Sequence, residues 1–389
     1  MAEGDGGACP VRSARPIDLH AALRLTNAAT FLFNSAGALF LLFPVYLQDL
    51  GSSAGQIGVV AGLLRASSLA ARPLGGSLLD RVGRRPVISA GAGLTILGIL
   101  SLFVSPQVSL VFLLMRIVQG VGTSLVDSGM GAVVADLSPR VSRARVFAIY
   151  SVYVCMASAV MPGLGEVIVR HAGYLPLFAA AAVVTAGGAA LVRRLPETVR
   201  VAGDSSQSRR GLVANEGPLL LGGLLLGLAY GVLSVFVPVT RIAAAPGRTG
   251  LFFFVYFAAL IGMRLASGLG PPWLARPQVL LPAYGVIVLG LAALPTGSSV
   301  FLLVFVGLAC GASHGVAVPV LFALLLYQVA PNQRGWAVAL LAAAFDLGNV
   351  VGTVGLGFVG EHWGIPAIFE LAAGIVALGA VVGHLWGRR

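Results

Sequence analysis

The chain has 389 residues, of which 58% are hydrophobic and only 10% charged, whereas about 25% of the residues of a typical soluble domain are charged. All 25 basic residues are arginines and lysine is absent. The missing lysine excludes a phosphate-binding P-loop and a pyridoxal Schiff base, and with them ATP hydrolysis and pyridoxal chemistry. We therefore predict a polytopic membrane protein that is not an enzyme and carries neither a cofactor nor a metal.

Hydropathy and turn residues divide the chain into twelve apolar segments, each long enough to cross a bilayer as a helix. They span residues 24–46, 55–75, 86–104, 108–134, 146–168, 173–192, 218–240, 250–270, 278–296, 299–327, 336–359 and 365–386. The predicted fold is all-α and integral to the membrane. The expected domains are a cytoplasmic tail over 1–23, a six-helix bundle over 24–192, a cytoplasmic linker over 193–217 and a second six-helix bundle over 218–389.

The arginines predict how the chain lies in the membrane. If the polar N-terminal tail is cytoplasmic, 17 arginines fall in inside segments and three in outside loops. Positive residues accumulate on the cytoplasmic side of membrane proteins, so we expect both termini in the cytoplasm. The net charge of +11 is then explained by lipid headgroups, and nucleic acid is not an expected partner. The exclusive use of arginine is typical of a GC-rich bacterial genome, which places the protein in a bacterial cytoplasmic membrane.

The two halves of the chain repeat each other. Arg72-x-x-x-Gly76 recurs as Arg264-x-x-x-Gly268, an offset of 192, and Gly173 with Phe178 recurs as Gly364 with Phe369, an offset of 191. These offsets lie close to half the chain length. We therefore predict two pseudo-symmetric bundles around a central site, an arrangement that permits alternating access.

Two motifs identify a family. The loop after the second segment reads Gly76-Ser-Leu-Leu-Asp80-Arg81-Val-Gly83-Arg84-Arg85, and the fourth segment contains Arg116-x-x-Gln119-Gly120-x-Gly122. Together with twelve segments and a long central linker, these strings resemble the signature motifs of the major facilitator superfamily. The resemblance implies two rocking bundles, with the first, fourth, seventh and tenth helices lining a cavity. The second, fifth, eighth and eleventh helices would then cross at the interface between the bundles.

The resemblance also assigns a gating role to the loop motif. Asp80 is expected to close the inner face against the start of the eleventh helix, and Asp136 to pair with an arginine of the motif. The alternative for Asp80 is a simple surface turn. The residues expected to act in gating are Gly76, Asp80, Arg81, Gly83, Arg84, Arg85 and Asp136.

The fifth segment bears on the direction of transport. Exporters of this family carry Gly-x-x-x-Gly-Pro-x-x-Gly-Gly, and this chain has Ala157-x-x-x-Met161-Pro162-x-x-Gly165-Glu166. The match is partial, so it favours export without deciding it.

Ionisable residues inside membrane spans are costly and are functional candidates by default. Asp346 and His314 fall near the membrane midplane, and we expect Asp346 to be the principal proton-coupling acid, assisted by His314. Helix-packing hydrogen bonds are the alternative for both. Glu166 is expected to pair with Arg116 or Arg65, either as a titrating site or as a static ion pair.

Other polar residues of the spans have less specific interpretations. Asp127 is either a structural partner of Arg72 or a further proton site. Asn349 lies three residues from Asp346 and is expected to orient it. Residues expected to offer polar contacts in the cavity, with interhelical hydrogen bonds as the alternative, are Asn27, Asn34, Arg65, Arg116, Gln119, Tyr230 and Asn349.

The sequence therefore predicts a secondary transporter that exports small amphipathic or cationic organic molecules in exchange for protons. Its expected partners are a small-molecule substrate, protons and the lipid bilayer, and we expect a monomer. One alternative is a proton symporter that takes up a sugar or another metabolite. Another is a receptor or scaffold that has this fold and does not transport.

Overall fold

A computed structural model describes residues 19–104, 108–138, 143–197, 216–240, 243, 245–269, 276–329 and 333–386. Most of the expected tail over 1–23 and of the linker over 193–217 lies outside these residues. The described part contains helices and turns but no strand. Twelve of its helical segments are long and apolar enough to cross a membrane, as the hydropathy predicts.

The first six spans form the N-terminal bundle. The first span is broken where Pro44 enters, because proline cannot donate a helical hydrogen bond. The elements of this bundle are α1 (Leu19–Leu39), η1 (Phe40–Leu42), α2 (Phe43–Asp49), α3 (Ala54–Val82), α4 (Arg84–Val104), α5 (Leu110–Leu137), α6 (Arg143–Ala172) and α7 (Tyr174–Val192).

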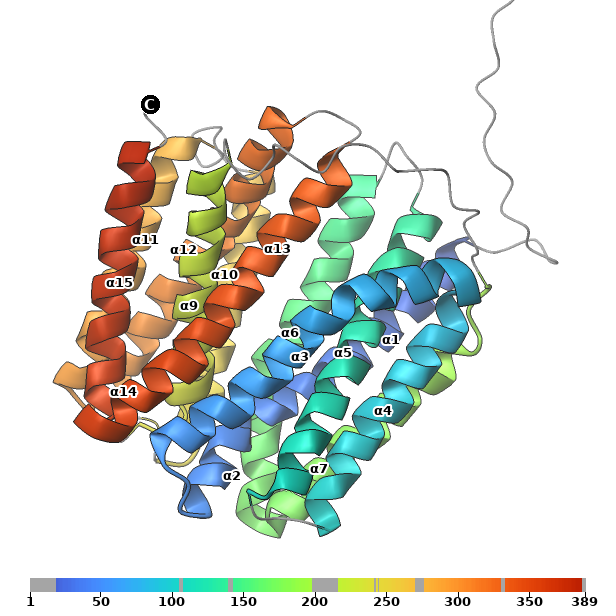
Figure 1. The fold of residues 1–389 in the computed structure, drawn as a ribbon, viewed down its shortest axis with the longest axis horizontal. Helices are drawn as coiled ribbons and strands as arrows, with labels where there is room; N and C mark the ends of the chain where they lie inside the picture. The colour runs from blue at the N-terminus through green and yellow to red at the C-terminus, as the bar shows by residue number, and fades with distance from the viewer. Residues whose placement is uncertain are drawn as a thin grey trace, which may run out of the picture.

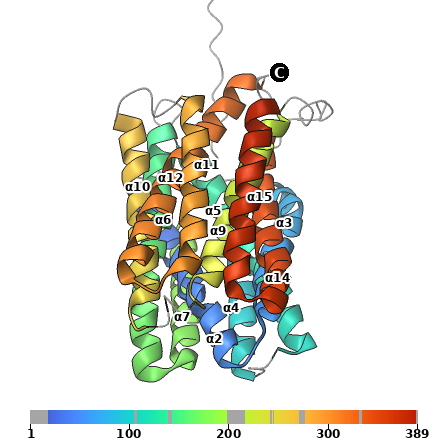
Figure 2. The ribbon, with the colours of Figure 1, turned by 90° about the vertical axis from the view of Figure 1, so that its left-hand side faces the viewer.

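The last six spans form the C-terminal bundle, which faces the viewer in Figure 2. Its elements are α9 (Gly217–Phe236), α10 (Arg248–Leu269), η3 (Pro277–Val279), α11 (Leu280–Ala293), η4 (Leu294–Thr296), α12 (Val300–Gln328), α13 (Arg334–Val350), η6 (Val351–Gly355), α14 (Leu356–Trp363) and α15 (Ile365–Trp386). The eleventh span consists of α13, the π-helical turn η6 and α14.

Turns between the helices reproduce the internal repeat. Gly173 and Gly364 precede α7 and α15, and their φ angles are +85° and +84°. Gly83 ends α3 with a φ of +105°. Residues with a side chain rarely adopt this backbone region, so glycine is required at these reversals of the chain. The sequence offset of 191 between Gly173 and Gly364 thus corresponds to equivalent turns in the two bundles.

The two bundles meet along two pairs of helices, α3 with the eleventh span and α6 with α10. We call the end that carries Gly83 the inner end and the end that carries the turn at Gly51 the outer end, following the orientation that the arginines predict. Figure 1 shows α3 beside α14 at the outer end of the molecule, and shows α3 and α13 diverging toward the inner end.

Glycines make the outer contact between α3 and the eleventh span possible. A Cβ atom on Gly58 would collide with the Thr353 carbonyl and lie 3.1 Å from the Gly357 Cα, and one on Gly62 would collide with Val354. The π-helical turn puts Thr353 at this crossing. Its hydroxyl donates to the Asn349 carbonyl at 2.9 Å, so the side chain is held by its own helix.

The inner part of α3 has no comparable contact with the C-terminal bundle. A Cβ on Gly76 would meet nothing within 4 Å, and one on Gly75 would approach only Leu125 and Ser128 of α5 in the same bundle. The structure is therefore closed between the bundles at the outer end and separated at the inner end.

Replacing Gly58 with alanine tests whether the outer crossing depends on the missing side chain. We expect Gly58→Ala to lower the free energy of unfolding by about 1–3 kcal/mol, the usual cost of overpacking, and to lower the thermal unfolding temperature of the purified protein. Gly93→Ala is the matched control, because nothing lies within 4 Å of a Cβ there. Equal unfolding temperatures for the two variants would contradict the close crossing.

Candidate functional site

A central cavity of about 340 Å³ lies between the bundles. It is lined mainly by the N-terminal bundle, with additional residues from α9 and α10. Its polar lining side chains are Asn34, Arg65, Thr95, Arg116, Gln119, Thr123, Asp127, Ser158, Thr185, Tyr230 and Ser234. The cavity thus contains five of the seven residues expected to contact a substrate.

Arg116 is the most enclosed charge of the cavity. It is 4% exposed, and its Nη1 donates to Gln119 Oε1 at 2.5 Å. Its guanidinium carbon lies 4.4 Å from the centre of the Phe43 ring and 5.3 Å from that of Phe40. The Nε atom of Arg116 is buried without a hydrogen-bond partner. Aromatic rings stabilise a nearby cation, so they hold the guanidinium in place while one donor is left free.

Arg65 and Asp127 supply the other charges of the cavity lining. Arg65 makes no hydrogen bond or salt bridge with another described residue. Asp127 interacts electrostatically with Arg65, Arg72 and Asp346 but forms no salt bridge within the described part of the chain. It is therefore not the close partner of Arg72 that one reading of the sequence expected.

The structure places two expected cavity residues elsewhere. Asn27 lines a separate pocket between α1 and α6 with His20 and Arg24, because it lies two helical turns farther toward the inner end than Asn34. Asn349 is buried at the crossing of α13 with α9, where its Cγ would lie 3.2 Å from a Cβ on Gly231.

The tenth span, α12, contributes no described residue to the cavity lining, although the resemblance implied that it would. Its His314 is buried behind Tyr230, with the two rings 5.7 Å apart and perpendicular. His314 Nδ1 and the Tyr256 hydroxyl are hydrogen-bonded at 2.6 Å. His314 also packs on the Phe345 ring. The imidazole therefore makes an interhelical hydrogen bond, and no described contact joins it to Asp346.

Asp346 instead forms an ion pair between the bundles. Its Oδ2 lies 2.5 Å from Nη2 of Arg72, and the side chains of Arg72 and Asp346 are 38% and 15% exposed. Arg72 belongs to α3 and Asp346 to α13, so the pair joins the second and eleventh spans at the interface between the bundles.

The equivalent position of the other helix pair holds a thiol. Subtracting the repeat offset of 192 from 346 gives 154, the neighbour of Cys155, and Arg264 repeats Arg72. In the structure, Nη1 of Arg264 on α10 donates to the Cys155 sulfur on α6 at 3.6 Å. The Nε atom of Arg264 is buried without a partner. The contact between an arginine and the crossing helix is thus present in both halves, but in the second contact a thiol stands where the first has a carboxylate.

Glu166 does not pair with Arg116 or Arg65. Its carboxylate oxygens accept hydrogen bonds from the backbone amides of Thr249 and Gly250, each at 3.1 Å. These amides belong to the first turn of α10, where a helix has free N–H groups and a partial positive charge. The expected ion pair was wrong because Glu166 points across the interface, next to the close approach of Gly163 and Gly250.

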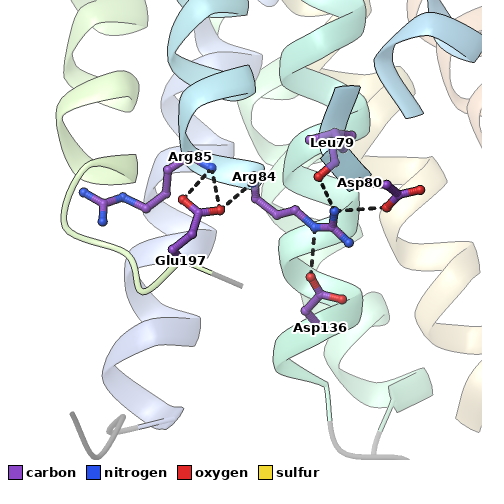
Figure 3. A network of polar contacts seen from close by, with 6 residues as sticks. All are labelled: Leu79, Asp80, Arg84, Arg85, Asp136 and Glu197. Atoms are coloured by element: carbon purple, nitrogen blue, oxygen red, sulfur yellow. Dashed lines mark hydrogen bonds and ion pairs between the residues drawn. The ribbon is translucent and has the colours of Figure 1, made fainter. Parts of the chain in front are cut away.

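At the inner end, the loop motif ties the N-terminal bundle together around Arg84 (Figure 3). The Nε atom of Arg84 donates to Asp136 Oδ2 at 3.1 Å, and Nη1 donates to the Leu79 carbonyl at 2.5 Å and to Asp80 Oδ1 at 3.1 Å. Asp136 is thus paired with an arginine of the motif. Asp80 is bound to Arg84 and is 55% exposed, rather than bound to the start of α13, because the inner ends of α3 and α13 are apart.

Glu197, a residue that sequence analysis missed, completes this network (Figure 3). Its carboxylate accepts from the backbone amide of Arg84 at 2.5 Å and from that of Arg85 at 3.2 Å. It therefore caps the first turn of α4 from beyond the end of α7, while Arg85 also donates to the Arg193 carbonyl. Arg81 is exposed. The polar sequence after α7 resembled an ordinary linker and gave no signal for this contact.

Residues 25–296 match the sequence profile of the Major Facilitator Superfamily. The chain belongs to this superfamily. Among the described residues, no group of three His, Cys, Asp or Glu side chains is placed to hold a metal ion. The arrangement as a whole is that of a multi-pass membrane transporter.

The relatives of this chain include a resistance protein and an export protein. The quinolone resistance protein NorA of Staphylococcus aureus is 27% identical over 152 residues, a match that covers 39% of this chain and 39% of NorA. The chain thus matches about two fifths of the length of this relative. The staphylopine export protein of the same species is 21% identical over 375 residues, which cover 92% of this chain and 94% of the exporter.

Solved structures of other transporters share the fold. The nucleoside transporter NupG superposes with a TM-score of 0.75 at 14% identity, covering 94% of this chain and 99% of NupG. The human organic anion transporter MFSD10 superposes with a TM-score of 0.70 at 18% identity, covering 95% of this chain and 100% of MFSD10. A bacterial homologue of the lysosomal transporter Spinster, solved in an inward-facing and occupied conformation, gives 0.73 at 16% identity, covering 96% and 98% of the two chains.

Substitution of Cys155 tests whether its position is equivalent to that of Asp346 in the internal repeat. In Cys155→Asp, a carboxylate would face Arg264 as Asp346 faces Arg72. Because a hydrogen bond to a charged group contributes about 1.5–3 kcal/mol, we expect a higher thermal unfolding temperature and slower transport. Cys155→Asn is the matched control, with the same shape and no charge. If both variants unfold at the same temperature, the equivalence of the two positions is wrong.

Glu166→Gln tests the outer contact. The amide keeps the shape of the side chain but loses the charge that favours a helix N-terminus, a contribution of about 0.3–2 kcal/mol. The reporter is Ser158→Cys in the cavity, in a chain whose three native cysteines are replaced by serine. We expect this cysteine to react faster with an impermeant maleimide added from the outer side when Glu166→Gln is also present. Glu370→Gln, on the exposed face of α15, is the control. Unchanged labelling by Glu166→Gln would show that the carboxylate does not hold the outer end closed.

Proposed function

We propose that this superfamily member exports small organic molecules across a bacterial cytoplasmic membrane in exchange for protons, by alternating access between its two bundles. The observation that carries the proposal is the Arg72–Asp346 ion pair. It lies within two membrane spans, it joins the two bodies that must move, and a single proton on the carboxylate removes its negative charge.

The position of the ion pair determines which side of the cavity it acts on. The outer ends of α3 and the eleventh span are already in contact through Gly58 and Gly62. Attraction between Arg72 and Asp346, farther toward the inner end, therefore resists separation of the inner ends. When Asp346 is protonated, this attraction is lost and the inner ends can move farther apart. When the proton leaves to the cytoplasm, the pair forms while the inner ends are still apart, as in this structure, and its attraction then favours closure of the inner side.

This order of events produces exchange. A proton taken up from the outside accompanies the return to the inward-open state and is released there. Substrate enters the cavity from the cytoplasm, the ion pair closes the inner side behind it, and the outer ends then separate. One proton thus enters for each closure that carries substrate outward, and the proton gradient supplies the free energy.

The direction of transport rests on two further supports. The partial exporter motif around Pro162 is on α6, and the relatives NorA and the staphylopine export protein are named as a resistance protein and an exporter. The arginine distribution supports an orientation in which the inner end faces the cytoplasm. Uptake by proton symport would use the same ion pair with substrate and proton moving together.

Transport by Asp346→Asn in proteoliposomes tests the coupling. The substrate is a compound from a screening panel whose addition makes the reconstituted protein release protons. The native protein should accumulate this compound against its concentration gradient when the proton gradient runs in the opposite direction. Asp346→Asn should lose this uphill accumulation by at least about tenfold and keep passive exchange, because the asparagine mimics the protonated carboxyl.

Two controls sharpen this test. Glu370→Gln removes an exposed acid outside the interface and should leave accumulation unchanged. The charge exchange Arg72→Asp with Asp346→Arg restores a pair but moves its acid to the other bundle. The exchanged pair, which keeps a titratable acid at the interface, should retain part of the uphill transport that Asp346→Asn loses. If Asp346→Asn transports uphill like the native protein, the pair is structural. Accumulation only when both gradients run in the same direction would establish uptake instead.

A further inference from the structure

The central cavity and the interface between the bundles hold more positive than negative charge. The charged residues that line the cavity or make a contact across the interface are Arg65, Arg72, Arg116 and Arg264, with Asp127, Asp346 and Glu166. Arg72 and Asp346 neutralise each other. The third acid of the interface, Glu166, is committed to the α10 amides at the outer end. Three arginines therefore remain with one aspartate.

Two of these three arginines line the same cavity. Arg65 comes from α3 and Arg116 from α5, and they interact electrostatically. Two like charges in a region of low dielectric repel each other strongly. Neither arginine forms a salt bridge with a described carboxylate, although Asp127 interacts electrostatically with Arg65. An arrangement of this kind is favourable when an anion lies between the two guanidinium groups.

The donors of both side chains are available to such an anion. Arg116 is 4% exposed, and its buried Nε has no hydrogen-bond partner, while only its Nη1 is used, by Gln119. Arg65 forms no hydrogen bond or salt bridge with any described residue. Guanidinium groups bind carboxylates through two parallel hydrogen bonds, so unused donors on both sides suit a carboxylate.

The charge and the walls of the cavity define the rest of the ligand. Arg65, Arg116 and Asp127 sum to one positive charge, which matches a monoanion. Asp127 is eleven residues beyond Arg116 on the same helix, roughly 16 Å toward the inner end, so it does not neutralise Arg116. Around the arginines, the lining is apolar and aromatic, with Phe33, Phe40, Phe43, Leu64 and Phe257.

We propose that the cavity binds its cargo as a small organic monoanion, with a carboxylate held between Arg65 and Arg116 and an apolar body packed against the phenylalanine rings. The inference rests on the proposed function, because it treats this cavity as the transport site. It replaces the sequence-based expectation of cationic cargo, since a cation would meet two arginines and only one acid.

Binding to the purified protein tests this assignment without any gradient. The probes are two series of matched molecules: benzoate, benzamide and benzylamine, and 2-naphthoate, 2-naphthamide and 2-naphthylmethylamine. Thermal unfolding and isothermal titration calorimetry measure binding. We expect a carboxylate to stabilise the native protein and the matched amide and amine not to do so.

Variants assign the binding to the arginines. Arg65→Gln should weaken carboxylate binding by about 10- to 100-fold, the usual effect of losing a charge-assisted hydrogen bond, and Arg65→Lys should weaken it less, because the charge remains. Arg276→Gln, which removes an exposed arginine before α11, is the control and should bind like the native protein. The unfolding temperature of each unliganded variant shows whether it has folded.

Three outcomes would overturn the assignment: stabilisation by the amine or amide equal to that by the carboxylate, native affinity in folded Arg65→Gln, or no binding of either carboxylate to the native protein. These outcomes are separate from failure of the proposed function. A protein that binds carboxylates through Arg65 but accumulates them without regard to the proton gradient would keep the anion site and lose the proton-coupled exchange.

Discussion

The close approach of the two bundles at their outer ends is the constraint on which the rest of the structure depends. It is made where side chains are absent, at Gly58 and Gly62 of α3 and at Gly163 and Gly250 of α6 and α10. Glu166 adds a carboxylate that binds the first turn of α10 across the same interface. Because the backbones touch there, the outer side of the cavity is closed in this structure while the inner ends of the bundles are apart (Figure 1).

Duplication of the chain explains both the symmetry of the interface and its one asymmetry. Each bundle contributes an arginine, Arg72 or Arg264, that reaches the crossing helix of the other bundle, but only Arg72 meets a carboxylate. A second ion pair would hold the other interface as well, and separating its charges inside the protein would leave each without its partner. With a thiol at Cys155, Asp346 is the only carboxylate of these two contacts. In the proposed exchange, a single protonation at Asp346 would therefore be enough to release it.

Much of the fold could be predicted from the sequence, because hydropathy, glycine turns and the repeat offset are local or periodic signals. Asp136 and the motif arginines were identified through the resemblance of the loop motif to that of the superfamily. The partners of Glu166 and Asp80 could not be predicted, because they depend on how far the bundles have rotated, and Glu197 acts from a segment with no recognisable pattern. The role of Cys155 could have been predicted, because subtracting the repeat offset of 192 from position 346 gives position 154, the neighbour of Cys155. For His314 the structure contains the interhelical hydrogen bond that was the alternative prediction; the sequence could not decide, because periodicity does not distinguish a cavity-lining face from one covered by Tyr230.

The distance between the inner ends as a function of pH tests most directly whether protonation of Asp346 opens the inner side. Spin labels at Leu78 on α3 and Val338 on α13, two partly exposed positions, report this distance by double electron–electron resonance in lipid nanodiscs. The account predicts a longer distance at low pH than at high pH in the native protein, and a long distance at both in Asp346→Asn. A native distance that does not change with pH, or the same pH response in Asp346→Asn, would contradict it.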